Sequence, residues 1–293
     1  MLGSLFSLMR PHQWIKNIFV LIPLFFGGKL FDLLCWREAI LAAIAFSFMA
    51  SAVYCINDLH DLEADRRHPK KKNRPLASGK IRPVEAIFLA VILVLSSFAI
   101  SYFMLAQAGP KVSLVLLFYF ILNILYCFKL KQYAIIDVFI VSFGFVLRLM
   151  AGGIACGIWL SPWIVLMTFL IALFLAFAKR RDDVVLYKTE QIKVRKNVIR
   201  YNLSFLNQTL GLIGAITIVC YIMYSVSPEV EMRFDNRHVY VTSIFVLAAI
   251  LRYLQVAIVD QRSGSPTKVL LRDRFIQVCL LLWSLSFVII LYL

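Results

Sequence analysis

Long apolar stretches separated by shorter polar segments run along the whole chain. Nine of these stretches approach the roughly 20 residues that a helix needs to cross the hydrocarbon core of a bilayer. We therefore predict an all-α, polytopic integral membrane protein with nine transmembrane helices. The predicted spans are about Trp14–Leu34, Ala39–Ile56, Val84–Ala106, Val112–Phe128, Ala134–Cys156, Pro162–Ala178, Ser204–Val226, Val239–Val259 and Arg274–Leu293.

The polar segments alternate in positive charge. Lys and Arg gather before the first span and after the second, fourth, sixth and eighth, as cytoplasmic segments do in membrane proteins. The segment with Lys29 and Arg37 is the exception, since it shows no contrast with its neighbours. We predict a cytoplasmic N-terminus, a C-terminus on the opposite side, and cytoplasmic polar loops at about 57–83 and 179–203. The first apolar stretch is expected to remain as a membrane span and not to be cleaved as a signal peptide.

Composition narrows the class of protein. The 293 residues are 61% hydrophobic, whereas a soluble domain is about 45–50% apolar, and the mean hydropathy is +0.83. The net charge of +15 lies at the ends of apolar stretches, so we expect attraction to anionic lipid or phosphate and no nucleic-acid partner. The six scattered cysteines form no CxxC pair and are expected to be small buried hydrophobes. No linker is visible, which predicts a single domain over residues 1–293.

The segment NDLHDLEADRRHPKKKNRPLASGK, residues 57–80, places charge directly after the second span. Acids at membrane depth are expensive and usually functional. Asp58, Asp61 and Asp65 are spaced three and four residues apart, so they share one face if the helix continues. With Asn57 they are candidate ligands of a Mg²⁺ ion that also binds a diphosphate. The alternative is a solvated helix end with internal Asp–Arg pairs.

Basic residues that follow the second and sixth spans are candidate phosphate ligands. Arg74, held in the sequence KNRPLASG, suits bidentate phosphate recognition. Lys179, Arg180 and Arg181 end the sixth span and could neutralise a second phosphate. Asp183, just beyond, could orient a hydroxyl or bind metal. Both groups could instead be ordinary topology signals.

Charged residues in and near the spans complete the candidate site. Asp137 and Arg148 are eleven residues apart in the fifth span and fall roughly on one side of a helix. Such residues usually face the bundle interior, as ligand contacts or as structural partners. Lys16 and Lys131 could reach the same cytoplasmic cavity, although snorkelling anchors are the simpler interpretation.

The NDxxDxxxD pattern after the second span, in a chain with nine predicted spans, resembles the UbiA superfamily of intramembrane prenyltransferases. KRRDD at Lys179–Asp183 departs from the second DxxxD-type motif of its aromatic prenyltransferases. The chain is instead similar to the branch that transfers phosphoribose to decaprenyl phosphate, which usually has a glutamate near the position of Asp183. The similarity rests on RPHQWIKN, LK before Asp137, FVLRLMAGG, KRR and LRYLQV…LLRDRFIQ.

That resemblance implies a Mg²⁺-dependent transfer of phosphoribose from phosphoribosyl pyrophosphate to a polyprenyl phosphate. It implies a bacterial inner-membrane enzyme with its site facing the cytoplasm and a product used for cell-envelope polysaccharide precursors. Asp58, Asp61, Asp65 and Arg74 would act on the leaving pyrophosphate, and Lys179, Arg180 and Arg181 would bind a phosphate. Two alternatives stay open: an aromatic prenyltransferase with a polyprenyl diphosphate donor, and a transporter lined by Asp137 and Arg148.

Overall fold

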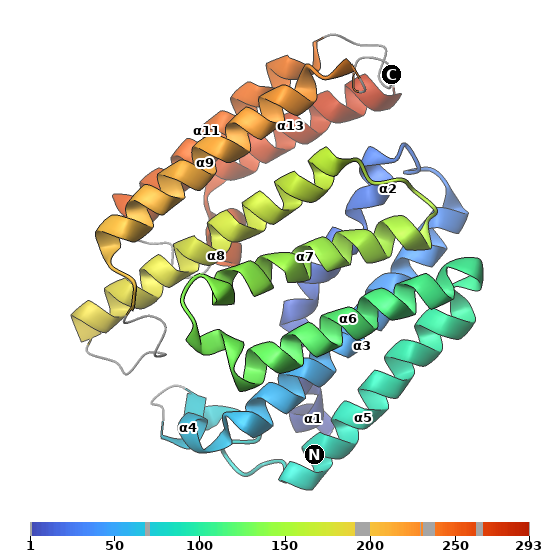
Figure 1. The fold of residues 1–293 in the computed structure, drawn as a ribbon, viewed down its shortest axis with the longest axis vertical. Helices are drawn as coiled ribbons and strands as arrows, with labels where there is room; N and C mark the ends of the chain where they lie inside the picture. The colour runs from blue at the N-terminus through green and yellow to red at the C-terminus, as the bar shows by residue number, and fades with distance from the viewer. Residues whose placement is uncertain are drawn as a thin grey trace. The chain divides into compact units, whose positions relative to one another are not determined.

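The computed structural model describes residues 2–67, 71–190, 200–228, 230, 238–261 and 266–292. Every regular element among them is helical (Figure 1). The elements are α1 (Leu2–Met9), η1 (Pro11–Val20), α2 (Ile22–Phe26), α3 (Leu33–His60), α4 (Leu62–Arg66), η2 (Lys71–Asn73), α5 (Pro83–Ala99), η3 (Ile100–Met104), η4 (Ala106–Ala108), α6 (Gly109–Phe128), η5 (Leu130–Gln132), α7 (Ile136–Ala155), α8 (Pro162–Glu190), α9 (Leu203–Ser225), η7 (Val239–Thr242), α11 (Ser243–Ile258), α12 (Pro266–Arg272) and α13 (Arg274–Tyr292).

Seven helices in the described part of the chain are long and apolar enough to cross a membrane, against the nine predicted. The predicted first span is divided, because η1 is a 3-10 helix and α2, with a proline near its start, has only five residues. The last apolar stretch, Arg274–Ile290, is shorter than the seven. The orientation of the termini stays a prediction.

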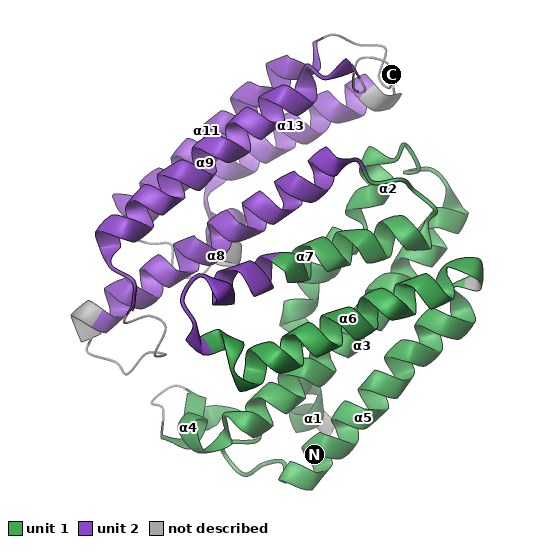
Figure 2. Cartoon of the chain, viewed as in Figure 1, with its two compact units in different colours: residues 1–131, 143–160 green, residues 132–142, 161–293 purple. Residues whose placement is uncertain are grey.

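The chain divides into two compact units (Figure 2). Unit 1 comprises Met1–Lys131 and Phe143–Leu160, and unit 2 comprises Gln132–Ser142 and Ser161–Leu293. Helix α7 runs through both, its first turns in unit 2 and the rest in unit 1. The predicted single domain is not tested by this division and stays a prediction.

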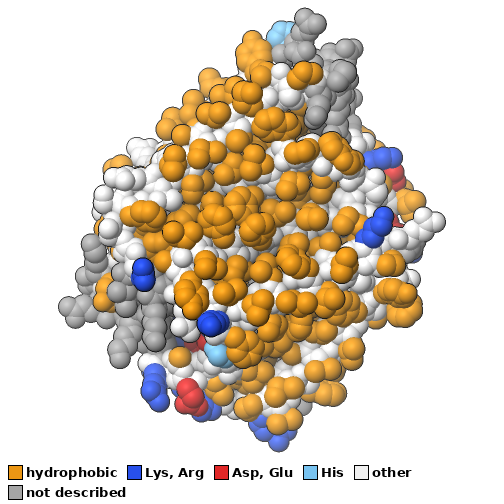
Figure 3. Space-filling model, viewed as in Figure 1, with side chains coloured by type: hydrophobic (Ala, Val, Ile, Leu, Met, Phe, Trp, Pro, Cys, Tyr) orange, Lys and Arg blue, Asp and Glu red, His pale blue; other side chains and the backbone are white. Residues whose placement is uncertain are grey.

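Helix α3 is the centre of unit 1. Asp32 caps its N-terminus by accepting hydrogen bonds from the backbone N–H groups of Leu34 and Cys35. Alanines buried on α3, such as Ala42 and Ala45, let α5 and α6 pack closely against it. The Ser97 hydroxyl of α5 reaches the Ala45 carbonyl at 2.7 Å. Figure 3 shows hydrophobic side chains over much of this unit, with charged ones near α4.

Unit 2 is built on α8, α9 and α11. Phe174 of α8 and Tyr253 of α11 meet edge to face, with ring centroids 5.3 Å apart, and Gly214 of α9 lies against Ile250 and Phe174. Helix α8 continues to Glu190. The first half of the predicted polar loop 179–203 is therefore helical, and residues 191–199 lie outside the described residues. Arg180, Arg181 and Asp182 of this extension are buried, so packing fixes the directions of their side chains.

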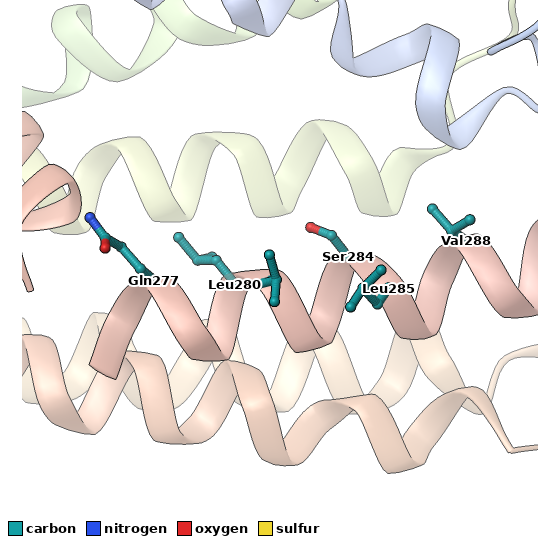
Figure 4. A pocket seen from close by; sticks show the side chains of 6 residues that line it. Gln277, Leu280, Ser284, Leu285 and Val288 are labelled. Atoms are coloured by element: carbon teal, nitrogen blue, oxygen red, sulfur yellow. The ribbon is translucent and has the colours of Figure 1, made fainter. Parts of the chain in front are cut away.

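Helix α13 carries a largely apolar groove of about 360 Å³. Figure 4 shows that the labelled side chains all project from this one helix. The groove is lined by Gln277, Leu280, Leu281, Ser284, Leu285 and Val288.

Candidate active site

The acidic motif lies where α3 ends. The predicted continuous helix is interrupted: α3 stops at His60, Asp61 adopts φ −90° and ψ 6°, and α4 begins at Leu62. Asp58 and Asp65 are buried, 2% and 3% exposed, whereas Asp61 is half-buried. The interruption changes which acids can act together.

Asp58 and Asp65 converge on one guanidinium. The NH1 nitrogen of Arg74 lies 3.1 Å from Oδ1 of Asp58 and 2.5 Å from Oδ2 of Asp65. Asp58 also accepts a hydrogen bond from Arg10 at 2.5 Å, and Lys71 lies 3.9 Å from Asp65. The two carboxylates are therefore held around one cationic nitrogen.

Asp61 faces elsewhere. Its Oδ1 accepts a hydrogen bond from Lys131 at 2.6 Å, and that lysine is 9% exposed. The backbone carbonyl of Asn57 accepts from the Asp61 N–H at 2.9 Å, and the Asn57 side chain is half-buried. The structure thus brings Asp58, Asp65 and Arg74 together and leaves Asp61 with Lys131.

The donor set suits a hard cation. Among the described residues, no three His, Cys, Asp or Glu side chains are gathered closely enough to hold a metal ion. Asp58 and Asp65 nevertheless enclose a positively charged nitrogen, and carboxylate oxygens are the ligands that Mg²⁺ prefers. A metal ion held by these two carboxylates would take the place of the Arg74 nitrogen.

Arg148 is buried inside unit 1, and no carboxylate of the described residues pairs with it. It is 5% exposed. Its guanidinium donates to Oδ1 of Asn17 at 2.7 Å, to the Gly144 carbonyl at 2.7 Å and to the Tyr119 hydroxyl at 3.2 Å. The ring centroids of Phe46, Tyr119 and Phe145 lie 4.8–5.5 Å from its guanidinium carbon. Hydrogen bonds and aromatic faces satisfy the group, but its charge is not neutralised.

A second cation lies beside Arg148. Lys16, in η1 and outside the seven candidate spans, is half-buried and makes no hydrogen bond or ion pair with the described part of the chain. Burial, then the charges of Arg148 and Arg10, lower the pKa of the Lys16 ammonium to about 8. Unit 1 therefore holds two cationic groups that lack an acid and favour an incoming anion.

Unit 2 holds a separate ionic cluster on α7 and α8. Asp137, 0% exposed, forms an ion pair with Arg180 at 2.7 Å and accepts a hydrogen bond from the Tyr201 hydroxyl at 3.1 Å. Arg180 also pairs with Asp183, one turn along α8. Burial raises the pKa of the Tyr201 phenol to about 12, so it stays a hydrogen-bond donor. Asp137 and Arg148, the pair expected in the fifth span, thus have different partners.

The three basic residues of the KRR sequence point in different directions. Lys179 is exposed and Arg180 faces Asp137. Arg181, 3% exposed, donates to Oδ1 of Asn207 on α9 at 2.8 Å and to the Ile258 carbonyl on α11 at 3.4 Å. Arg181 therefore fastens α8 to its neighbouring helices.

Several partners in these clusters were not predicted from the sequence. Arg10, Asn17, Tyr119 and Tyr201 contact the candidate residues from distant parts of the chain. Arg10 and Asn17 do lie in the RPHQWIKN segment. Tyr119 and Tyr201 stand in segments whose composition carries no signal for a site.

These clusters belong to a membrane transferase. Residues 18–271 match the UbiA prenyltransferase family, and the chain belongs to that family. Two relatives are named decaprenyl-phosphate phosphoribosyltransferase. The one from Corynebacterium glutamicum is 34% identical over 287 residues, covering 97% of this chain and 85% of that protein. The one from Mycolicibacterium smegmatis is 35% identical over 296 residues, covering 97% and 91%.

Solved structures show the same fold. The structure of a UbiA homologue from Archaeoglobus fulgidus bound to DMAPP and Mg²⁺ has a TM-score of 0.71 at 20% identity and covers 98% of this chain and 99% of that one. A second structure of a UbiA homologue from the same organism, bound to GPP and Mg²⁺, has a TM-score of 0.68 at 20% identity, covering 99% and 100%. The predicted family and its all-helical fold are confirmed.

Proposed function

We propose that this protein transfers the phosphoribosyl group from phosphoribosyl pyrophosphate to a polyprenyl phosphate and releases pyrophosphate. The proposal rests on the similarity, over 97% of the chain, to relatives named decaprenyl-phosphate phosphoribosyltransferase. The reaction takes place at the cytoplasmic face of the bacterial inner membrane and supplies precursors of cell-envelope polysaccharide.

The acidic cluster of unit 1 acts on the leaving group. The bond between the anomeric carbon and pyrophosphate breaks while a bond to a phosphate oxygen of the acceptor forms. Asp58 and Asp65 would hold Mg²⁺, which when bound would supply positive charge for the departing pyrophosphate. Asn57 and Asp61, the other predicted ligands, would join them only if Asp61 left Lys131. Arg74 leaves the two carboxylates and donates hydrogen bonds to a phosphate oxygen. Lys131 holds the Asp61 carboxylate.

The unpaired cations of unit 1 bind a substrate phosphate. Lys16 and Arg148 have no carboxylate partner in the part of the chain that the structure describes, so a phosphate would neutralise charge that these residues leave uncompensated. The acceptor phosphate is already ionised and needs little help from a general base.

The ionic cluster of unit 2 binds a second phosphate. Lys179 is exposed, and its long side chain can reach an anion at the surface of α8. Arg180 is oriented by Asp137 and Asp183, and an incoming phosphate can replace Asp183 as its partner. Arg181 supports this arrangement through its hydrogen bonds to Asn207 of α9 and to the Ile258 carbonyl of α11.

Labelled phosphoribosyl pyrophosphate tests the proposal. Membranes that contain the protein are incubated with this donor, Mg²⁺ and decaprenyl phosphate, and label in the lipid fraction is counted. We expect label to enter the lipid, and Asp58→Asn or Asp65→Asn to reduce transfer at least about a hundredfold. Glu63→Gln is the matched control, since Glu63 is an exposed acid of the same segment paired only with Arg66.

A second activity is tested in parallel. The solved homologues bind GPP or DMAPP, so the same membranes receive a prenyl diphosphate and 4-hydroxybenzoate. Prenylated product without any labelled lipid would replace the phosphoribosyl proposal by aromatic prenyl transfer. A chelator that leaves transfer unchanged would refute the role given to the metal.

A further inference from the structure

Two cysteines from distant parts of the sequence meet in unit 1. Cys35 lies in the first turn of α3, and Cys156 directly follows α7. The Sγ atom of Cys156 is 3.4 Å from the Cys35 carbonyl oxygen, and the Sγ atom of Cys35 is 3.9 Å from the Cys156 carbonyl oxygen. Each thiol therefore contacts the backbone of the other residue, although 121 positions separate them in the chain.

This reciprocal contact places the two residues side by side. A disulfide requires Cα atoms about 4.4–6.8 Å apart. Rotation about the two Cα–Cβ bonds would turn the sulfurs from the carbonyls toward each other.

Tight packing holds both positions. A Cβ atom at Gly152 would lie 1.8 Å from the Val20 carbonyl oxygen, so the end of α7 is pressed against η1. Cys35 packs in a small apolar cluster with Leu24 and Ala39, and Cys156 packs against that cluster. The approach of the two thiols therefore follows from close helix packing.

The pair lies at the end of α3 opposite to the acidic motif. Cys35 begins this 28-residue helix and Asp58 lies near its end; at about 1.5 Å of rise per residue the helix is about 42 Å long. That length exceeds the roughly 30 Å of the hydrocarbon core. If the basic segments are cytoplasmic, the two cysteines lie on the outer side of the membrane, where the oxidising surroundings preserve disulfides.

We propose that Cys35 and Cys156 form a disulfide at the outer surface of the membrane. It replaces the expectation that all six cysteines are only small buried hydrophobes. The bond would fasten the start of α3 to the end of α7, the helices that carry Asp58 and Arg148. It does not depend on which substrates the protein uses.

The oxidant is the disulfide of a thiol–disulfide oxidoreductase. Cys35 reaches the outer side first, and its thiolate attacks one sulfur of that disulfide, releasing one oxidant thiolate. The Cys156 thiolate then attacks the Cys35 sulfur and releases the second. Two thiols of this chain are oxidised and one oxidant disulfide is reduced to two thiols. Burial in the folded protein raises the pKa of the Cys156 thiol to about 12, so the exchange belongs to folding, before that thiol is buried.

Mass spectrometry of the full chain tests the link. Cells grown in air are quenched with acid and N-ethylmaleimide, and the protein is digested without reduction. We expect one peptide pair that joins Cys35 to Cys156 and disappears on reduction. Complete alkylation of both cysteines, or a link between other cysteines, overturns the proposal and leaves two thiols that contact carbonyl groups.

Two further measurements separate the link from its consequences. In intact cells, a membrane-impermeant reductant added before the quench should remove the linked peptide; a link that is lost only when the cells are opened places the pair inside and overturns the outer location. In detergent, Cys156→Ser and chemical reduction should each lower the Tm by the same several degrees. Reduction should lower the Tm of the Cys156→Ser variant no further. Cys220→Ser is the control, since Cys220 lies half-buried on α9 of unit 2. If the wild-type chain transfers label but carries no link, this inference fails and the proposed function stands.

Discussion

Replacing Arg148 by methionine separates a binding role from a structural one. Methionine keeps an unbranched apolar stem for the rings of Phe46, Tyr119 and Phe145 and removes the charge. The substitution lowers the stability of the fold mainly because the buried Oδ1 atom of Asn17 loses its hydrogen-bond donor, which costs about 1–3 kcal/mol. Relief of an uncompensated buried charge offsets part of that cost. We therefore expect a small fall in Tm.

The effect on substrate use should be larger. A hydrogen bond from a charged donor contributes about 1.5–3 kcal/mol, which corresponds to about a 10- to 150-fold change in affinity. Steady-state transfer in detergent, with each substrate varied in turn, should show that KM rises by this factor for one phosphate substrate. The substrate whose KM rises identifies which phosphate Arg148 contacts.

Arg252→Met is the matched control for this substitution. Arg252 of α11 pairs with Asp273 at 2.9 Å and belongs to no proposed phosphate site. Its loss should lower the Tm and leave both KM values unchanged. If Arg148→Met behaves in the same way, with a lower Tm and unchanged KM, Arg148 is a structural residue and the binding argument is refuted.

Three other outcomes follow from the ionic groups. Asp137→Asn leaves Arg180 without its buried partner and should cost about 3–5 kcal/mol; a thermal melt with unchanged Tm would contradict this. Lys16, with a pKa of about 8, loses its proton as the pH rises from about 7 to about 9, so KM for its phosphate substrate should rise. Lys16→Arg should abolish that rise because arginine stays charged, and an identical pH profile would exclude Lys16. Burial raises the pKa of the Asp273 carboxyl, but hydrogen bonds from Arg252 and the Ile276 N–H outweigh it and hold the pKa below its usual value. The native state is thus stabilised above the unfolded pKa of about 4, and this stability is lost as the pH falls through the native pKa. Melts between pH 5 and 3 should show less acid sensitivity in Arg252→Met.

The apolar pattern was sufficient to predict a helical membrane protein, because each stretch must satisfy its own backbone hydrogen bonds inside a bilayer. It was a poorer guide to the length of each helix. Trp14–Leu34 has the composition of a span, yet Pro23 and a 3-10 stretch divide it. Lys179–Glu190 has the composition of a loop, yet it continues α8 because Arg180 and Arg181 find partners on neighbouring helices.

The candidate residues were visible in the sequence because charge close to a bilayer is conspicuous. Their grouping was not. Spacing placed Asp58, Asp61 and Asp65 on one face, but a break at Asp61 turns it toward Lys131. Likewise, Asp137 and Arg148 share a helix but bind groups in different units.

Spacing along one helix determines only which side chains share a face. Which charge meets which depends on residues brought in by other helices, such as Arg10 beside Asp58, Tyr119 beside Arg148 and Cys156 beside Cys35. The sequence by itself determined the class of protein and most of the chemical groups at the candidate site. Only the tertiary structure decided their partners, because those contacts join residues far apart in the chain through close helix packing.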